Sequence, residues 1–320
     1  MQKILTEQHV PVMVQEVFEL LSPALEFENS VLVDCTLGLG GHSEHFLKEH
    51  DRLKVIGFDQ DPIALTRAKE RLAVYKKRVV FVGKNFNQLR TELNEIQIKK
   101  VNAIIFDLGV SSIQIDERER GFSYLTSDPL DMRMNQSQSL NAQEIVNTWQ
   151  EQEIAKILFQ YGEEKFAKKI AKNIINKRNK SLIKTTAELV EIINSSIPAP
   201  ARRTGGNPAK KTFQALRIAV NQELDVLKEA LLQAVEIVAP GGRIAVLTYH
   251  SLEDRIVKQF FKSLIRVSDI PREIPVIESL QQDFKLITNK PLRPTKAEIA
   301  INSRSKSAKL RGIEKLMRAA

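Results

Sequence analysis

Apolar and polar positions alternate in a regular way along the first third of the chain. Four short runs of β-branched and other large apolar residues predict strands; they lie at 31–35, 53–58, 79–82 and 101–107. Helical spacing of apolar positions is present at residues 62–75, between the second and third runs, and at 13–21. The fourth run is almost continuously apolar, as expected for a strand that helices cover on both faces. Strands alternating with helices predict an α/β fold with a doubly wound, mostly parallel sheet.

The alternation stops after the fourth predicted strand. Residues 116–140 are polar and irregular, and helical patterns follow without a strand between them, at 141–148, 151–160, 163–178 and 185–195. A basic loop rich in proline and glycine then leads to a helix expected over 213–238, a Pro-Gly-Gly turn and the strand RIAVLTY. We therefore expect residues 1–115 and 213–320 to form the sheet domain, with residues 116–212 as an inserted helical domain.

A glycine-rich turn, TLGLGG, connects the first predicted strand to a helix. Gly38, Gly40 and Gly41 let the backbone approach a ligand closely, and the start of a helix offers N–H groups that have no helical partner. Ser43 stands where the dinucleotide motif G-x-G-x-x-G needs its third glycine, and no lysine follows as in a P-loop. The turn is therefore typical of a site for a nucleoside without a pyrophosphate, such as S-adenosylmethionine.

Asp59 closes the second predicted strand, where a carboxylate can accept hydrogen bonds from both hydroxyls of a ribose. Alternatively, the glycines only make a tight turn and Asp59 caps the helix that begins at Pro62. Ligands of open α/β sheets bind beyond the carboxyl ends of the strands. We therefore expect the residues at these ends to converge; they are Gly38–Gly41, Asp59, Asn85–Phe86, Asp107 and Tyr249–His250.

The chain carries 48 lysine and arginine residues against 39 aspartate and glutamate residues, a net charge of +9. Such an excess attracts polyanions, although lysine can also serve only to keep a protein soluble. Basic residues gather at 202–211 and 302–318. No apolar run approaches the roughly 20 residues of a membrane span, the N-terminus lacks a signal-peptide core, and the single cysteine, Cys35, fits a reducing compartment. We expect a cytoplasmic protein with no membrane partner.

Eight motifs then give the chain a family resemblance. In order they are TLGLGGHS, DLGVSS, GFSY, DPLDMRMN, YGEEKFAKKIA, TFQALRIAVNQEL, YHSLEDRIVKQFF and SRSKSAKLR. Together they resemble the bacterial ribosomal RNA small-subunit methyltransferase H family, also called MraW. The resemblance implies a Rossmann-like class I methyltransferase with a helical insertion. It also implies transfer of a methyl group from S-adenosylmethionine to N4 of a cytidine in the decoding region of 16S ribosomal RNA, within the small ribosomal subunit.

The resemblance assigns cofactor contacts to seven residues, which are Gly40, Gly41, His42, Asp59, Phe86, Asp107 and Gln114. The glycines and His42 would receive the methionine end of the cofactor on backbone N–H groups. Asp59 would hold the ribose, Phe86 would offer an apolar face to the adenine, and Asp107 would accept from the ammonium. Phe86 could instead be a simple core residue, and Gln114 a solvated loop residue.

Methylation of an exocyclic amine requires in-line alignment with the sulfonium and acceptors for the amine hydrogens. DNA amino-methyltransferases usually place an Asp/Asn-Pro-Pro-aromatic turn after the fourth strand, whereas this chain has Asp-Leu-Gly-Val at 107–110. We expect the backbone and side chains of Asp107, Ser111 and Ser112 to supply the acceptors. His250 is a candidate proton relay, and a structural hydrogen bond within YHSLED is the alternative.

RNA contacts are expected from two aromatic residues and nine basic ones; they are Phe122, Tyr124, Arg133, Arg202, Arg203, Lys210, Lys211, Arg304, Lys306, Lys309 and Arg311. The aromatic pair could instead pack in the core of the insertion, and Arg133 could make an internal salt bridge. Two departures from the family pattern, Lys211 in place of an arginine and Ser303 in place of a proline, leave the details of RNA contact open.

Other readings of the chain remain at this point. His42 and His45 share a helix face, but no further cluster completes a tetrahedral site, so no metal is expected. A nucleotide-dependent oxidoreductase would use the same sheet, but the missing third glycine argues against it. A non-catalytic RNA-binding assembly factor, or a methyltransferase acting on DNA or ribosomal protein, stays open. We expect a monomer or a homodimer.

Overall fold

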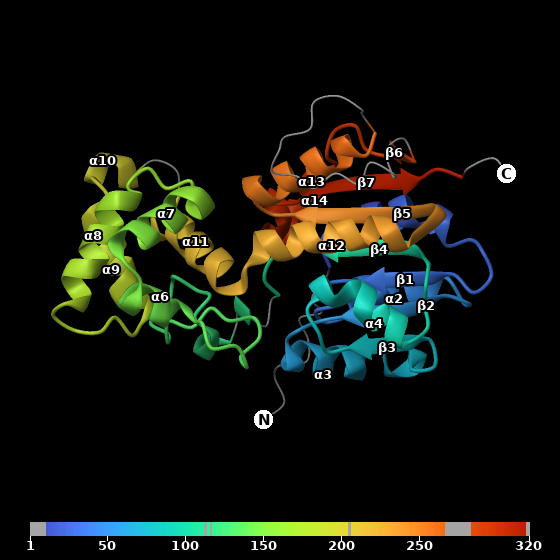
Figure 1. The fold of residues 1–320 in the computed structure, drawn as a ribbon, viewed down its shortest axis with the longest axis horizontal. Coiled ribbons are helices and arrows are strands. Elements are labelled where there is room, and N and C mark those ends of the chain that lie inside the picture. Colours follow the sequence, from blue (N-terminus) through green and yellow to red (C-terminus); the bar gives the residue numbers. More distant parts are fainter. Residues whose placement is uncertain (1–10, 112–113, 116, 204–205, 266–282, 318–320) are drawn as a thin grey trace. The chain divides into compact units, whose positions relative to one another are not determined.

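A computed structural model describes residues 11–111, 114–115, 117–203, 206–265 and 283–317. Its main feature is a seven-stranded sheet with the strand order β3-β2-β1-β4-β5-β7-β6 (Figure 1). The strands are β1 (Val31–Asp34), β2 (Lys54–Phe58), β3 (Val79–Val82), β4 (Val101–Asp107), β5 (Val238–Thr248), β6 (Phe284–Leu286) and β7 (Lys309–Lys315). Strands β1 to β5 are parallel, while β7 runs antiparallel to β5 and to β6. The expected doubly wound, mostly parallel sheet is confirmed.

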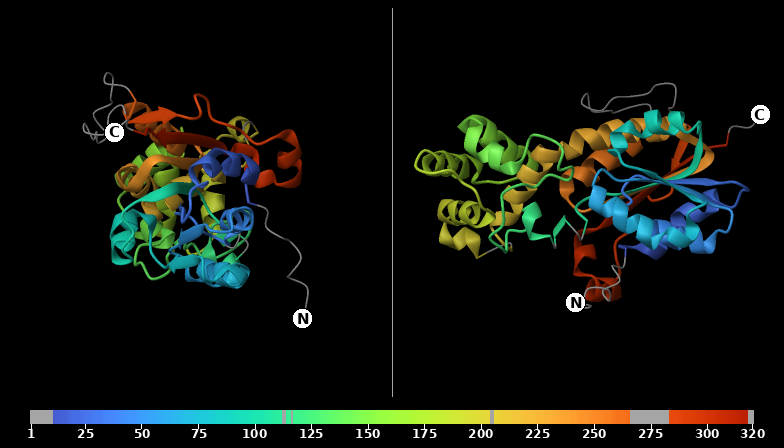
Figure 2. Two further views of the ribbon diagram at one scale, coloured as in Figure 1. Left: turned by 90° about the vertical axis from the view of Figure 1, so that its right-hand side faces the viewer. Right: turned by 90° about the horizontal axis from the view of Figure 1, so that it is seen from below.

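Helices cover both faces of this sheet (Figure 2). One apolar layer contains α1 (Val14–Leu21), α2 (Gly41–Glu49) and α3 (Pro62–Arg71), and the other contains α4 (Leu89–Glu95), α12 (Glu223–Ile237) and α13 (Ser251–Ser263). Along β4, Ala103 and Ile105 point into the first layer, whereas Ile104 and Phe106 point into the second. Because successive side chains of a strand alternate between faces, burial on both sides requires the continuous apolar run.

Short elements complete this part of the chain; they are η1 (Ser22–Ala24), η2 (Ala73–Tyr75), η3 (Phe86–Gln88), α14 (Lys296–Ile301) and η6 (Ser303–Ser307). Together with the sheet they belong to a compact unit formed by residues 1–109 and 224–320, which we call the core unit. Within the described part of the chain, no helix is long and apolar enough to cross a membrane.

Residues 110–223 form a second compact unit, which we call the helical unit. Its elements are η4 (Arg118–Arg120), α6 (Ala142–Thr148), α7 (Glu151–Gly162), α8 (Ala167–Arg178), α9 (Thr186–Ser196), α10 (Ala199–Arg202) and α11 (Ala209–Asn221). They enclose an apolar core of their own, to which α6, α7, α8, α9 and α11 all contribute buried side chains. The apolar core of the helical unit is therefore built from residues of this segment.

The prediction of one helix over 213–238 is wrong. The segment contains two helices, because Gln222 adopts a left-handed conformation with φ of 50° and ends α11. Phe213 and Leu216 of α11 are buried in the core of the helical unit, whereas Leu227 and Leu231 of α12 are buried in the core unit. The division between the units consequently falls at 223/224, not at 212/213, and its other end falls at 109/110.

The tightest backbone approach in the helical unit involves Gly121. This residue has φ of +68°, and a Cβ atom there would lie 2.1 Å from the carbonyl oxygen of Pro129. We expect Gly121→Ala to lower the free energy of unfolding of the helical unit by at least about 1–3 kcal/mol, the usual cost of such a strained residue. Urea denaturation followed by circular dichroism would measure the loss.

Gly206 provides the matched control, because its φ is +88° but no atom of the described residues lies within 4 Å of the position that a Cβ atom would occupy there. Gly206→Ala tests the backbone strain without the collision, so a smaller loss is expected. Equal losses for the two variants would contradict the argument from the Pro129 carbonyl.

Candidate cofactor site

The turn after β1 is held in place by a buried carboxylate. Asp34 is nearly inaccessible to solvent, and it accepts hydrogen bonds from the Ser43 hydroxyl at 2.7 Å and from the Thr36 N–H at 3.2 Å. Burial raises the pKa of the Asp34 carboxyl above its usual value, against these two donors. Ser43, which replaces the third glycine of the dinucleotide motif, therefore ties the first turn of α2 to the end of β1.

The glycines of this turn adopt conformations that other residues rarely adopt. Gly38 has φ of 51°, and Gly40, which precedes α2, has φ of 76°. Since Gly40 has no side chain to cap the helix, the N–H groups at the start of α2 stay available for an acceptor on a ligand.

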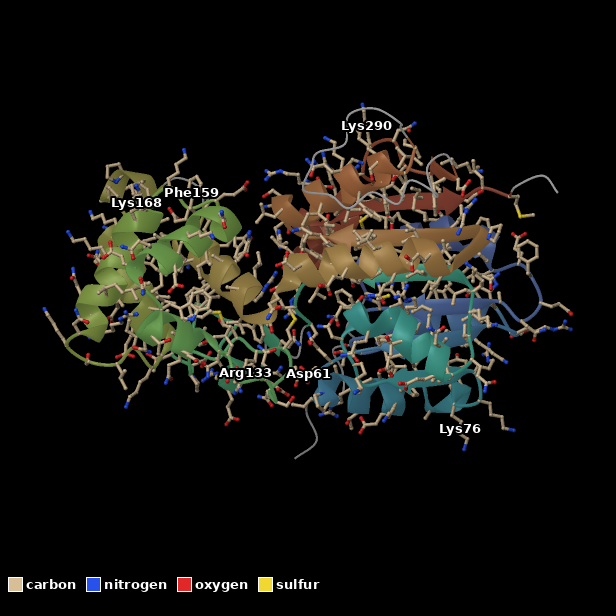
Figure 3. The ribbon with its side chains drawn as sticks, in the orientation of Figure 1. Asp61, Lys76, Arg133, Phe159, Lys168 and Lys290 are labelled. Carbon is tan, nitrogen blue, oxygen red and sulfur yellow. The ribbon has the colours of Figure 1, made fainter. Side chains whose placement is uncertain are left out.

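Asp59 joins this turn directly. Its Oδ2 accepts from the Gly38 N–H at 2.8 Å, and its Oδ1 accepts from the Asp61 N–H at 2.9 Å. Burial nevertheless raises the pKa of Asp59 to about 6, because loss of hydration outweighs these two donors. The N-cap of α3 is Asp61, which accepts from the Ile63 N–H (Figure 3), so the alternative that Asp59 caps this helix is wrong.

Asp107 links the ends of three parallel strands. Its backbone N–H donates to the Thr36 hydroxyl at 2.6 Å, and its Oδ1 accepts from the Tyr249 hydroxyl at 2.6 Å. Burial and the neighbouring Asp107 charge hold the pKa of Tyr249 well above its usual value. The tyrosine therefore remains a hydrogen-bond donor, and Asp107 Oδ2 is left facing the His42 ring at 3.5 Å from Nε2.

His42 is only 5% exposed, yet within the described residues neither of its ring nitrogens has a hydrogen-bond partner. Its distance to Asp107 is within the range of an ion pair, but the geometry is not that of a hydrogen bond. Leaving a buried polar group unpaired costs about 1–3 kcal/mol. A buried imidazole without a partner, between the glycine turn and an aspartate, can form its hydrogen bond with a polar ligand instead.

Phe86 follows β3 and is half-buried. Its ring meets Phe106 edge to face, with 5.7 Å between the centroids and 80° between the planes. The neighbouring Asn85 side chain donates to Gln60 Oε1 at 3.0 Å, which ties the end of β3 to the end of β2. Phe86 is therefore both a core contact and a partly exposed aromatic surface at the strand ends.

These residues fit S-adenosylmethionine. The N–H groups that begin α2 suit its carboxylate, Asp59 suits the ribose diol, and Phe86 suits the adenine. Asp107 keeps one oxygen for the ammonium, since Tyr249 occupies the other. All of them lie in the core unit. Tyr249 was expected at the strand ends without an assigned role, and the contributions of Asp34, Thr36 and Ser43 were not predicted.

The remaining residues predicted around the cofactor and the acceptor lie in the helical unit or outside the described residues. Gln114 is 5% exposed and pairs with Ser111: the Ser111 N–H donates to Gln114 Oε1 at 3.1 Å, and the Gln114 N–H donates to Ser111 Oγ at 3.3 Å. Ser112 lies outside the described residues. The predicted roles of Ser111 and Gln114 stay predictions.

His250 serves a structural purpose. It is the N-cap of α13, and the Glu253 carboxylate accepts from the backbone N–H groups of Tyr249 and His250 at 2.8 and 3.2 Å. The Glu253 N–H in turn points to His250 Nδ1, and His250 Nε2 lies 3.0 Å from Glu253 Oε1. This is the structural alternative for YHSLED, and we do not assign His250 a proton transfer.

The predicted RNA contacts divide into exposed and engaged side chains. Six are exposed, namely Arg202, Arg203, Lys210, Lys211, Arg304 and Lys306. Lys309 and Arg311 in β7 both pair with Asp254, at 2.8 and 2.7 Å, and Arg311 is 8% exposed. The two side chains share the one carboxylate of Asp254, which compensates one of their two charges. Their predicted phosphate contacts stay predictions.

Within the helical unit, Arg133 has the internal salt bridge that the sequence left as its alternative. Its guanidinium donates to Asp131 and to the carbonyl oxygens of Gln136 and Gln138 (Figure 3). Phe122 and Tyr124 pack on the helical core, where Tyr124 meets Phe213 edge to face at 5.6 Å. These three side chains stabilise the unit in which they lie.

Comparison with known families identifies the type of site. The model of the MraW methylase family matches residues 6–316, nearly the whole chain. The chain belongs to the MraW methylase family. It is a methyltransferase, and S-adenosylmethionine is its methyl donor.

Solved structures similar to this family member include an rRNA methylase from Streptococcus thermophilus, which is 14% identical with a TM-score of 0.42. The similarity covers 95% of this chain and 94% of the other. A putative rRNA-methylase from Clostridium thermocellum is 15% identical with a TM-score of 0.43, and 95% of each chain is covered. At these scores the likeness carries no argument beyond the family.

The pKa of Asp59 predicts a pH dependence of cofactor binding. The ribose hydroxyls donate to the ionised Asp59 carboxylate, so the cofactor binds best when Asp59 is ionised. In the free site this carboxylate becomes protonated as the pH falls through about 6. We expect the Kd for S-adenosylmethionine to be constant above pH 7 and to rise by up to about tenfold per pH unit below pH 6. Calorimetry from pH 5 to 8 would measure it.

Asp59→Asn is the control for this titration, because the amide cannot ionise. Its Kd should be higher than that of the wild type at pH 8 and nearly constant down to pH 5. A wild-type Kd that did not change over this range would contradict the role of Asp59.

Tyr249→Phe tests the hydrogen bond that orients Asp107. The substitution keeps the ring and removes the only donor to Oδ1 among the described residues. We expect the Kd for S-adenosylmethionine to rise about fivefold, corresponding to roughly 1 kcal/mol for one hydrogen bond. Tyr75→Phe is the matched control, because the Tyr75 ring stacks on Arg78 in the core unit away from the strand ends. Equal affinities for the two variants would refute the assignment.

Proposed function

We propose that this methyltransferase modifies the exocyclic N4 of a cytidine in the decoding region of 16S ribosomal RNA. The strongest support is that the chain contains all eight sequence motifs and also has a site in which Asp107 ends the fourth strand. The substrate in this proposal is the RNA of the small ribosomal subunit.

The sulfonium of the cofactor supplies an electrophilic methyl group, so the protein has no need to activate the donor. The N4 lone pair of cytosine is delocalised into the ring, which makes the amine a weak nucleophile. In-line attack by N4 would form the nitrogen–methyl bond as the sulfur–methyl bond breaks, with S-adenosylhomocysteine as the leaving group. The extra proton on N4 would then pass to solvent. The protein's contribution is alignment and hydrogen-bond acceptance at this nitrogen.

The residues of the core unit have separate parts in this scheme. Asp59 and Phe86 fix the nucleoside, and the start of α2 fixes the carboxylate of the methionine end. Tyr249 keeps Asp107 oriented, so the Oδ2 atom presents a fixed negative charge close to the reacting groups. The backbone after β4, including Ser111 and the undescribed Ser112, supplies the acceptors for the cytosine amine in this proposal.

The test is incubation of the protein with labelled S-adenosylmethionine and small ribosomal subunits that lack the modification. We expect label at N4 of a single cytidine in the decoding region. Asp107→Asn should lower the single-turnover rate by about 100-fold, the usual scale for loss of a preorganised electrostatic group. Mapping the labelled nucleoside by mass spectrometry would locate the site.

Lys76→Gln is the control, because Lys76 is an exposed side chain of the core unit and has no assigned role (Figure 3). It should methylate like the wild type. Label on DNA, on ribosomal protein or on another base would contradict the proposal and leave only the methyltransferase assignment.

A further inference from the structure

Helix α8 of the helical unit has an unusual charge distribution. Its apolar side is buried in the helical core through Ala167, Ile170, Ala171 and Ile174. Its other side is basic, and the whole stretch from 165 to 184 contains eight basic residues and no acidic one; they are Lys165, Lys168, Lys169, Lys172, Lys177, Arg178, Lys180 and Lys184. A solvated helix normally interleaves both signs of charge.

Six of these residues are exposed. Four of the six, Lys165, Lys168, Lys169 and Lys172, lie in the first two turns of α8 or just before it, and we call them the α8 lysine face (Figure 3 labels Lys168). Within the described residues, none of the four ammonium groups has a hydrogen bond or an ion pair. Arg178 differs, because its guanidinium donates to the carbonyl oxygens of Val146 and Trp149 and so stabilises the fold. The four lysines have no such structural task.

The α8 lysine face is unfavourable for the helix itself. Three of its members are at or before the first turn of α8, where the helix dipole disfavours positive charge by about 0.3–1 kcal/mol per residue. Lys168 and Lys172 are four residues apart within α8, so their ammonium groups repel one another. The neighbouring helices are conventional, since α7 and α9 carry glutamates in their first turns. Helix stability therefore does not account for this arrangement.

We propose that the α8 lysine face binds the phosphate backbone of the substrate RNA. The inference rests on the proposed function, because the family assignment alone does not name a polyanion. Unpaired ammonium groups gain from phosphate contact without breaking an internal salt bridge, and each contact releases a condensed counterion. Such contacts position an RNA without reading its sequence. This surface is distinct from the exposed basic residues at 202–211 and 304–306.

The test replaces all four lysines with glutamine, as K165Q/K168Q/K169Q/K172Q. RNA binding is measured by fluorescence anisotropy with 16S ribosomal RNA at several salt concentrations. We expect at least about a tenfold loss of affinity near 0.1 M salt. The slope of log K against log salt should decrease by roughly 3, since each single-strand contact contributes about 0.7.

The matched control removes the same charge from four exposed lysines of the core unit whose ammonium groups have no partner among the described residues, as K54Q/K76Q/K77Q/K99Q. Its RNA affinity should stay within about twofold of the wild type. Both variants should keep the wild-type circular dichroism spectrum and thermal unfolding curve, which shows that each remains folded. Equal RNA affinities and salt slopes for the two variants would overturn the inference, since net charge alone would then explain binding.

Anionic lipid is the other polyanion that such a face could meet. Sedimentation with phosphatidylcholine vesicles containing phosphatidylserine should show no difference between wild type and the α8 variant. Vesicle binding that depends on the four lysines, with RNA binding unchanged, would overturn the inference. A wild type that labels no ribosomal cytidine would refute the proposed function instead, and the RNA-binding comparison would still test the α8 lysine face separately.

Discussion

The arrangement of the site depends on one constraint: a parallel sheet buried on both faces brings the carboxyl ends of its strands to one edge. Four of these ends carry the polar groups of the cofactor site. Hydrogen bonds then couple the ends to one another, Asp59 to Gly38 and Asp107 to both Thr36 and Tyr249. Because each carboxylate is bound by backbone or side-chain donors, its position is set by the sheet and not by a mobile loop.

In the free site, two buried polar groups are in energetically unfavourable states. His42 is buried without a hydrogen-bond partner among the described residues, and burial raises the pKa of Asp59 to about 6. Neither feature improves the free fold, since buried polar groups are ordinarily satisfied. A ligand that donates to Asp59 and meets the polar edge at His42 relieves both. Part of the binding energy of the cofactor therefore comes from relieving these two unfavourable states.

Much of the core unit could be predicted from the sequence, because its strands are short apolar runs and its glycine turn has few alternatives. The convergence of Gly38 with Asp59 followed from topology alone. The break at Gln222 could not be predicted, since apolar spacing continues through it while the two helices bury their faces in different cores. The pairing of His250 with Glu253 and of Lys309 and Arg311 with Asp254 could not be predicted either, because it arises only through a helix cap and a strand pairing.

This last case shows why the net charge of +9 is a poor guide to the location of a polyanion surface. At β7 Lys309 and Arg311 share the carboxylate of Asp254, so about half of the local positive charge is compensated there. At α8 the reverse holds, since four lysines face solvent and have no partner among the described residues. Three of them lie in α8 itself, and Lys168 and Lys169 oppose its dipole. Unpaired positive charge that destabilises the helix carrying it indicates an anion-binding surface more specifically than the number of lysines does.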